Sequence, residues 1–290
     1  MTRLGGLSLY DGTATVASAP VIRRYSSSFR LATSLFPSRC RKAVGSIYAL
    51  VRIADEIVDG TAAEAGLDLP AQAERLDELE AETARAIATG FSANLVVHAF
   101  ANVARTTDIP PEPIGAFFAS MRRDLDDVDF DDVEYRTYIH GSAEAVGLMC
   151  LRVFVHESDV PGEDLGPLES GAARLGAAFQ KVNFLRDLGE DTRRLDRAYL
   201  PGVDQGGLTE AAKAAIVADI REDLDAARAA IHALPRDCRR AVRVATEIFG
   251  ELLRRIERLP ADRLAKVRVS VPATRKLAIA LRCTLMPGRA

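Results

Sequence analysis

The stretch that decides the fold is Tyr48-Ala-Leu-Val-Arg52-Ile-Ala-Asp55-Glu-Ile-Val-Asp59. Its four numbered residues stand at offsets 0, 4, 7 and 11, and at about 100° per residue they share one narrow stripe of a helix. The remaining positions are almost all apolar. The pattern predicts a helix that is buried around most of its circumference and still carries two carboxylates on one line.

A second segment repeats this layout. In Gln180-Lys-Val-Asn183-Phe-Leu-Arg-Asp187-Leu-Gly-Glu-Asp191, the residues at offsets 0, 3, 7 and 11 place amides and carboxylates on one face. Two buried carboxylates four residues apart repel each other, and a bound cation removes that cost. Mg2+ prefers oxygen ligands and bridges carboxylates to phosphates, so two such pairs facing a cavity would hold diphosphate groups through metal ions.

The alternative reading of these aspartates is structural. Charged residues on helices usually face water, cap a helix or form ion pairs, and one DxxxD pair alone favours that reading. Two pairs, each with further polar residues on its stripe in an otherwise apolar helix, favour a functional site.

Outward from these two segments, the chain consists of long stretches rich in Ala, Leu, Arg and Glu, and alternating strand patterns are hard to find. Short breaks rich in Pro or Gly separate the stretches, and none resembles an interdomain linker. We therefore expect an all-α, single-domain bundle. The expected helices span residues 21–35, 38–59, 70–88, 93–107, 113–125, 133–155, 165–192, 211–234, 236–259 and 271–285.

Composition and charge exclude several classes of protein. Basic and acidic residues, 38 and 41 in number, are well mixed and give a net charge of −3, so no global field attracts nucleic acid. No apolar run approaches the roughly 20 residues that span a bilayer. The four cysteines are far apart in the sequence and lack the paired spacing of a zinc site, which predicts reduced, mostly buried thiols.

The first twenty residues are rich in turn-forming types, and we expect a flexible N-terminal segment at 1–20 before a catalytic domain at 21–290. They lack the features of a secretory signal, so we expect a cytoplasmic protein.

Three other metal sites are disfavoured. The acidic run at 124–134 has Asp132 and Tyr138 where a calcium loop needs Gly and Glu, so we expect a solvated loop. The four histidines show no zinc-ligand spacing, and a Glu-x-x-His di-iron motif does not occur.

At these motifs the sequence resembles the squalene/phytoene synthase family, the head-to-head prenyltransferases, over nearly the whole chain after about Tyr10. The resemblance rests on Tyr25-Ser-Ser-Ser-Phe29, Arg41-Lys42-Ala43, Arg52-x-x-Asp55-x-x-x-Asp59, Tyr138-x-x-x-x-Ala143-x-x-x-Gly147, Gln180-x-x-Asn183-x-x-Arg186-Asp187-x-x-x-Asp191, Arg197-x-Tyr199-x-Pro201, and Val267-Arg268-Val269 with Lys276. Four positions depart from the pattern of the family: Tyr25 for a common His, Glu144 and Asp196 for Gly, and Phe249 where relatives can carry Tyr.

The resemblance implies the isoprenoid-synthase bundle with a central cavity, prenyl diphosphate substrates, and Mg2+ or Mn2+. By the same resemblance, metal ligands would be Asp55, Asp59, Asp187 and Asp191, and catalytic residues would be Tyr48, Arg52 and Tyr138, with the two tyrosine rings steadying cationic intermediates. Both rings could equally be ordinary core packing. Groups for binding diphosphate would be Ser26, Ser28, Arg52, Gln180, Asn183, Arg186, Arg268 and Lys276.

Small residues predict a roomy pocket for the prenyl tail, with Thr33 and Gly45, next to Ala32 and Ala49, on its wall. A roomy pocket favours two geranylgeranyl diphosphates as substrates and phytoene as product, without NADPH. The alternatives are a relative that uses farnesyl diphosphate to make presqualene diphosphate, squalene or dehydrosqualene, and an inactive helical assembly factor. Peripheral membrane contact is expected from the solubility of the product alone, and the sequence makes no prediction about oligomeric state.

Overall fold

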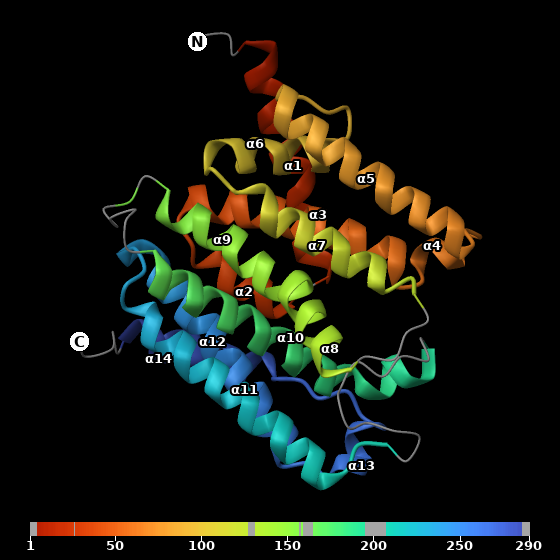
Figure 1. Cartoon of the computed structure of the whole chain (residues 1–290). Helices are drawn as coiled ribbons and strands as arrows, with labels where there is room; N and C mark the ends of the chain where they lie inside the picture. Colours follow the sequence, from red (N-terminus) through yellow and green to blue (C-terminus); the bar gives the residue numbers. More distant parts are fainter. Residues whose placement is uncertain are drawn as a thin grey trace.

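The computed structural model describes residues 5–25, 27–126, 131–156, 158, 165–194 and 207–285, without the side chains of 27–30 and 189–194. Within these ranges every regular element is a helix, which confirms the all-α prediction (Figure 1). The elements are α1 (Gly6–Tyr25), α2 (Ser27–Ser34), α3 (Ser38–Val58), α4 (Thr61–Glu64), α5 (Leu69–Thr89), α6 (Leu95–Thr106), α7 (Pro111–Arg123), α8 (Asp132–Ile139), η1 (His140–Glu144), α9 (Ala145–Val155), α10 (Gly166–Arg194), α11 (Glu210–Ile231), α12 (Arg236–Glu257), α13 (Ala261–Leu264) and α14 (Ala273–Leu285).

Local sequence signals explain where several helices begin and end. Asp68 caps α5 by accepting a hydrogen bond from the Ala71 N–H at 3.0 Å, and Asn94 caps α6 through the Val96 and Val97 N–H groups. Gly90 ends α5 with a φ of 80°, a left-handed conformation that costs glycine little. These caps confirm the helix ends predicted from the sequence to within a few residues.

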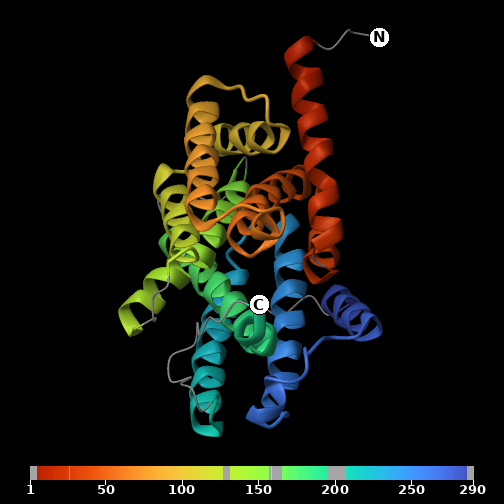
Figure 2. The same ribbon diagram turned by 90° about the vertical axis from the view of Figure 1, so that its right-hand side faces the viewer.

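The first helix is a correction to the expected flexible segment. Gly6–Tyr25 forms α1, which packs against α3 and α6 and stands along one side of the molecule (Figure 2). Polar contacts bind it to α6: Asp11 accepts hydrogen bonds from Asn102, at 2.9 Å, and pairs with His98 at 2.8 Å. Tertiary contacts thus hold a helix whose glycines, threonines and internal Pro20 disfavour it locally.

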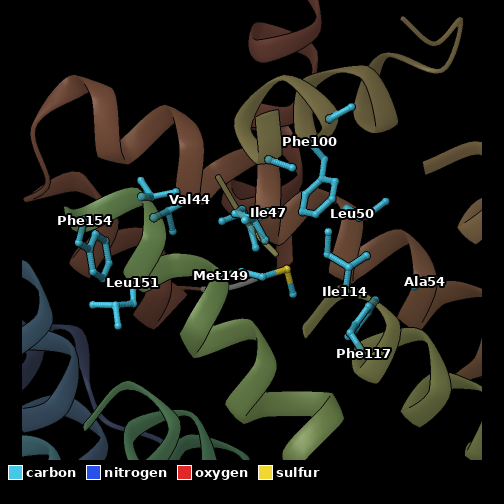
Figure 3. Close-up of a cluster of buried hydrophobic side chains, with 14 of the residues drawn as sticks. Val44, Ile47, Leu50, Ala54, Phe100, Ile114, Phe117, Met149, Leu151 and Phe154 are labelled. Carbon is cyan, nitrogen blue, oxygen red and sulfur yellow. The ribbon is translucent and has the colours of Figure 1, made fainter. Parts of the chain in front are cut away.

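The main hydrophobic core lies between α3, α6, α7 and α9. Figure 3 shows Ile47 and Leu50 of α3 beside Phe100, Phe117 and Met149 from the three other helices. These side chains are almost fully buried. The core holds one side of α3 in place, so the opposite side of that helix is left for the polar stripe.

A π-helical turn, η1, interrupts the helix that the sequence predicted over 133–155. Here α10 approaches very closely: a Cβ on Gly176 would lie 2.4 Å from the Ala143 carbonyl oxygen, and a Cβ on Gly147 would lie 2.4 Å from that of Ala172. Such separations exclude any side chain at the two glycines. They therefore fix the spacing between η1–α9 and α10, and with it one wall of the cavity described next.

Candidate functional site

One cavity of about 660 Å3 runs through the bundle between α2, α3, α7 to α12 and the start of α14. This volume is within the range of sites for small molecules. Apolar and small side chains make up most of its wall, and charged residues from α3, α10 and the C-terminal region complete it. The two polar stripes seen in the sequence both open into this space.

The α3 stripe lies on the cavity wall over its full length, because all four of its residues, Tyr48, Arg52, Asp55 and Asp59, line the cavity. Burial raises the pKa of the Tyr48 phenol to about 12, while Arg186 of α10 acts on it in the opposite direction. Gln180, Asn183 and Asp187 of the α10 stripe line the same cavity. The described residues of the α3 and α10 stripes therefore open into one shared space.

Arg52 is held from three sides. Its Nε donates to Glu56 Oε1 at 2.6 Å, its guanidinium approaches Asp55 Oδ2 to 3.8 Å, and it lies 4.4 Å from the centre of the Tyr25 ring. Glu56 also accepts a hydrogen bond from Thr61. The ring of Tyr25, which departs from the usual His of the family, supplies a cation–π contact at the edge of the cavity.

Asp55 is in an unfavourable electrostatic position. Burial, and then the neighbouring carboxylate of Asp59, raise the pKa of Asp55 well above its usual range, although Arg52 opposes the shift. The carboxylate of Asp124 also raises the pKa of Asp55. A divalent cation would relieve this repulsion and allow the two neighbouring, partly buried carboxylates to stay ionised together.

The α10 stripe contributes Gln180, Asn183 and Asp187 to the same cavity. Asp187 accepts a hydrogen bond from Arg186 Nε at 2.9 Å and pairs with Arg268 Nε at 3.0 Å. The side-chain oxygen of Asn183 is buried and has no hydrogen-bond partner among the described residues. A buried acceptor without a hydrogen-bond partner on a cavity wall can be satisfied by a bound ligand or water molecule.

Lys276 completes the charged part of the wall from α14. Burial lowers the pKa of its ammonium, and repulsion from Arg186 lowers it further. Together with Arg268 and Arg186, it makes a group of cations on the cavity wall. An anion bound among them would relieve their mutual repulsion.

Tyr138 lines the cavity and donates a hydrogen bond to Asp124 Oδ2 at 2.9 Å. Asp124 is only 4 % exposed, so its place in the expected solvated loop at 124–134 is wrong. Asp124 directly follows the last turn of α7 as its C-cap, and at this position its side chain is buried. The sequence offered no signal that separates Asp124 from its acidic neighbours.

The residues predicted to line a pocket for the prenyl tail lie in different positions relative to the cavity. Thr33 and Ala32 of α2 line the cavity, whereas Gly45 and Ala49 of α3 do not. Gly45 is about 100° around the helix from the lining residue Val44, and this rotation turns it away. The remaining small residues of the wall come from other helices and were missed: Ala143, Gly147, Gly171, Ala172, Gly176, Ala227, Ala230 and Ala245.

Two other residues that depart from the family pattern, Phe249 and Glu144, lie in the described part of the chain. Phe249 lines the cavity and stacks on Phe179 with ring centres 3.8 Å apart. Glu144 pairs with His140 at 2.9 Å and is not part of the cavity wall, so it adds no acid there. Ser142, which the sequence reasoning did not single out, also lines the cavity, and its buried hydroxyl has no hydrogen-bond partner within the part of the chain that the structure describes.

Some predicted residues lie outside the described part of the chain. These are Ser26, the side chain of Ser28, the side chain of Asp191, and the segment with Asp196 and Tyr199. Among the described residues, no group of three or more His, Cys, Asp or Glu side chains is already gathered as a metal site. Asp55, Asp59 and Asp187 share the cavity, with Asp187 held by arginines.

The sequence model of the squalene/phytoene synthase family matches residues 22–275. A 15-cis-phytoene synthase of a Paracoccus species is 34 % identical over 202 residues, covering 66 % of this chain and 62 % of that protein. A phytoene synthase of Arthrospira platensis is 33 % identical over 188 residues, which cover 62 % of this chain and 59 % of that protein. The chain thus aligns with about three fifths of the length of these two relatives.

Among solved structures, a dehydrosqualene synthase in complex with a ligand superposes with a TM-score of 0.78, covering 97 % of this chain and 99 % of that one. The sequences are 22 % identical, so this similarity concerns the fold. It confirms the expected helical bundle.

Proposed function

The chain belongs to the squalene/phytoene synthase family, and we propose that it joins two molecules of geranylgeranyl diphosphate head to head to make phytoene, through a cyclopropyl diphosphate intermediate. The observation that carries this proposal is the make-up of the cavity. Carboxylates and cations that suit metal ions and diphosphate open into the same space as a long apolar wall that suits prenyl tails.

Asp55, Asp59 and Asp187 are the described residues that would hold the metal, with Asp191 as the fourth expected ligand. The raised pKa of Asp55 and the orphaned oxygen of Asn183 both fit a divalent cation and its hydration shell. When bound, Mg2+ would neutralise the diphosphate and make it a better leaving group.

The cations of the wall would bind the diphosphate directly. Arg186 donates a hydrogen bond to Asp187, Arg268 forms an ion pair with it, and repulsion from Arg186 lowers the pKa of Lys276. Oxygens of a diphosphate would accept hydrogen bonds from all three and offset their mutual repulsion. These contacts would hold the departing group away from the allylic cation.

Tyr48 and Tyr138 would face the reacting carbons. Burial raises the pKa of the Tyr48 phenol to about 12, which keeps the phenol neutral, and the hydrogen bond to Asp124 orients the ring of Tyr138. A ring face stabilises a nearby cation by roughly 0.5–2 kcal/mol. The stacked rings of Phe179 and Phe249 extend this aromatic surface.

The choice of a twenty-carbon tail is supported by the small residues of α9, α10 and α11 on the wall. Gly171 of α10 and Ala230 of α11 are two of these lining residues. A wall without protruding side chains leaves length for the tail. The curated relatives that the chain resembles are phytoene synthases, which agrees with this choice.

The test is product analysis with purified protein, Mg2+, and farnesyl and geranylgeranyl diphosphates offered in competition. We expect phytoene, formed without NADPH. Predominant thirty-carbon products would overturn the choice of tail, and presqualene diphosphate or squalene would be told apart by adding NADPH. Asp187→Asn should abolish turnover, with the exposed Asp262→Asn as control, and unchanged turnover in Asp187→Asn would contradict its role as a metal ligand. No product from the original protein with either substrate would favour an inactive assembly factor.

A further inference from the structure

The outer face of α14 carries an exposed leucine stripe. Leu277, Leu281 and Leu285 recur every four residues, so they share one side of the helix, and their exposed fractions are 65 %, 57 % and 70 %. Isolated exposed leucines are ordinary, but three in line on one helix form a continuous apolar surface. We call these three residues the leucine stripe.

The opposite face of α14 already has its packing partners. Ile279, Ala280 and Cys283 are buried against Val244 and Ile248 of α12, with leucines of α2 beside them. The helix therefore does not need the leucine stripe for its place in the fold. Among the described residues the stripe has no covering element, as its exposure shows.

The charges on α14 are all positive. Residues 273–285 include Arg275, Lys276 and Arg282 and no acidic residue. Arg275 and Arg282 lie along one edge of the leucine stripe and are about half exposed, while each touches a glutamate of α12, Glu251 and Glu247, at 3.3 Å. An apolar stripe with a basic edge is complementary to a lipid surface that carries negative charge.

We infer that the leucine stripe docks α14 onto the surface of an anionic bilayer, with the helix lying in the plane of the interface. At thirteen residues α14 is about 20 Å long, too short to cross a bilayer. No helix in the described parts of the chain is both long and apolar enough to do so. The leucine stripe would therefore contact lipid with α14 lying parallel to the membrane surface.

A second copy of the chain fits the same surface less well. Stable dimers bury about 800 Å2 on each partner, and three leucine side chains offer only a fraction of that area. The basic edge would also face its own copy across a two-fold contact. Charge and area together favour lipid.

The position of the stripe gives docking a consequence for catalysis that rests on the proposed function. Lys276 lines the cavity, and the next residue, Leu277, begins the stripe on the outside. Docked α14 would hold the charged part of the cavity wall close to the headgroups. Prenyl diphosphates, whose tails lie in the bilayer, could then enter with a short path through water.

The test uses the full-length protein and sedimentation with two kinds of vesicle, pure phosphatidylcholine and an equal mixture with phosphatidylglycerol. We expect binding to the mixed vesicles that falls at least tenfold in the variant Leu277→Ser/Leu281→Ser/Leu285→Ser. The matched control, Leu7→Ser/Leu9→Ser/Val16→Ser, removes three side chains of α1 with exposures of 59 %, 62 % and 71 %, and should bind as the original protein does.

The inference would be overturned if the original protein did not bind vesicles, or if the stripe variant bound them equally well. It would also be overturned if the substitutions abolished a dimer, detected by light scattering, without changing vesicle binding. If the triple variant unfolds, the single substitution Leu281→Glu should still abolish binding while melting normally, since position 281 is exposed. Vesicle binding requires no turnover. Loss of the proposed function would therefore appear as absent phytoene with docking intact.

Discussion

At the scale of single residues, the site contains groups of like charge that repel one another, and a bound ligand of opposite charge would reduce this repulsion. Asp55 and Asp59 repel each other on α3, and Lys276 and Arg186 repel each other across the cavity. Ion pairs such as Arg268 with Asp187 relieve part of this repulsion. The arrangement is pre-organised for a metal–diphosphate group, which carries charges of both signs.

Asp124 is predicted to act through Tyr138. Asp124→Asn keeps the shape of the side chain but removes the charge that orients the phenol, so we expect turnover to fall about tenfold to a hundredfold with KM nearly unchanged. Tyr138→Phe should have a similar effect. If the two act as a unit, the double variant will lose no more than either single one, as a double-mutant cycle would show; additive losses would separate their roles.

Glu251 of α12 gives a prediction about pH. Burial alone would raise its pKa, but hydrogen bonds from Arg254, Arg275 and Arg255 outweigh it and lower the pKa to about 2. A carboxyl whose pKa falls on folding stabilises the fold above its unfolded pKa of about 4.3, and this stabilisation is lost as pH falls toward 2.

Glu251→Gln should therefore lower the free energy of unfolding by about 1–3 kcal/mol at pH 7, and the difference from the original protein should shrink below about pH 4. Urea unfolding at several pH values measures it. Glu257→Gln, on the same helix and more exposed, is the control and should change little. A difference that is constant with pH would contradict the linkage.

At the scale of elements, the close contact between η1–α9 and α10 decides the shape of the cavity wall. Gly147 and Gly176 come from opposite sides of this contact, and each meets a backbone carbonyl of the other element. The π turn widens the helix at the point of contact, a feature frequent at functional sites. Substrate space and helix packing thus depend on the same residues.

Gly176→Ala should destabilise the fold by about 1–3 kcal/mol, because the new methyl group collides with backbone that cannot move independently. Gly45→Ala is the matched control: it is also within a helix, but its Cβ would meet no atom within 4 Å, so it should be neutral or stabilise by about 0.5–1 kcal/mol. Melting temperatures of the two variants test the contrast. Equal effects would mean that the close approach is not rigid.

At the scale of the whole molecule, the cavity joins residues that lie far apart in the chain. Asp55 of α3 and Lys276 of α14 are separated by 221 positions and line the same space. Figure 1 shows α10, the long helix that carries the second stripe, between α9 on one side and α11 and α12 on the other. A ligand bound in the cavity would therefore link the first and last parts of the bundle.

Ligand binding should accordingly stabilise the whole fold, and only when metal is present. We expect inorganic diphosphate with Mg2+ to raise the melting temperature by several degrees, and EDTA to abolish the rise, since a ligand at 100 times its Kd adds about 2.7 kcal/mol. Asp187→Asn should lose the effect and Asp262→Asn should keep it. A rise of equal size with diphosphate alone would show that the cations suffice.

The sequence by itself determined the helical class, most helix ends and the two polar stripes, because these depend on periodicity and on capping residues within one segment. It also identified the family. The stripe residues whose side chains the structure describes, such as Asp55, Arg52 and Asn183, line the cavity.

Tertiary structure decided the rest. Helix α1 forms because α3 and α6 hold it, against the preference of its own residues. Asp124 turns inward, and Gly45 turns away from the cavity, because rotation of a helix about its axis is set by its neighbours. The wall of small residues is likewise assembled from helices whose mutual approach no local pattern encodes. Packing, which is long-range in sequence, selects which face of each helix meets the substrate space.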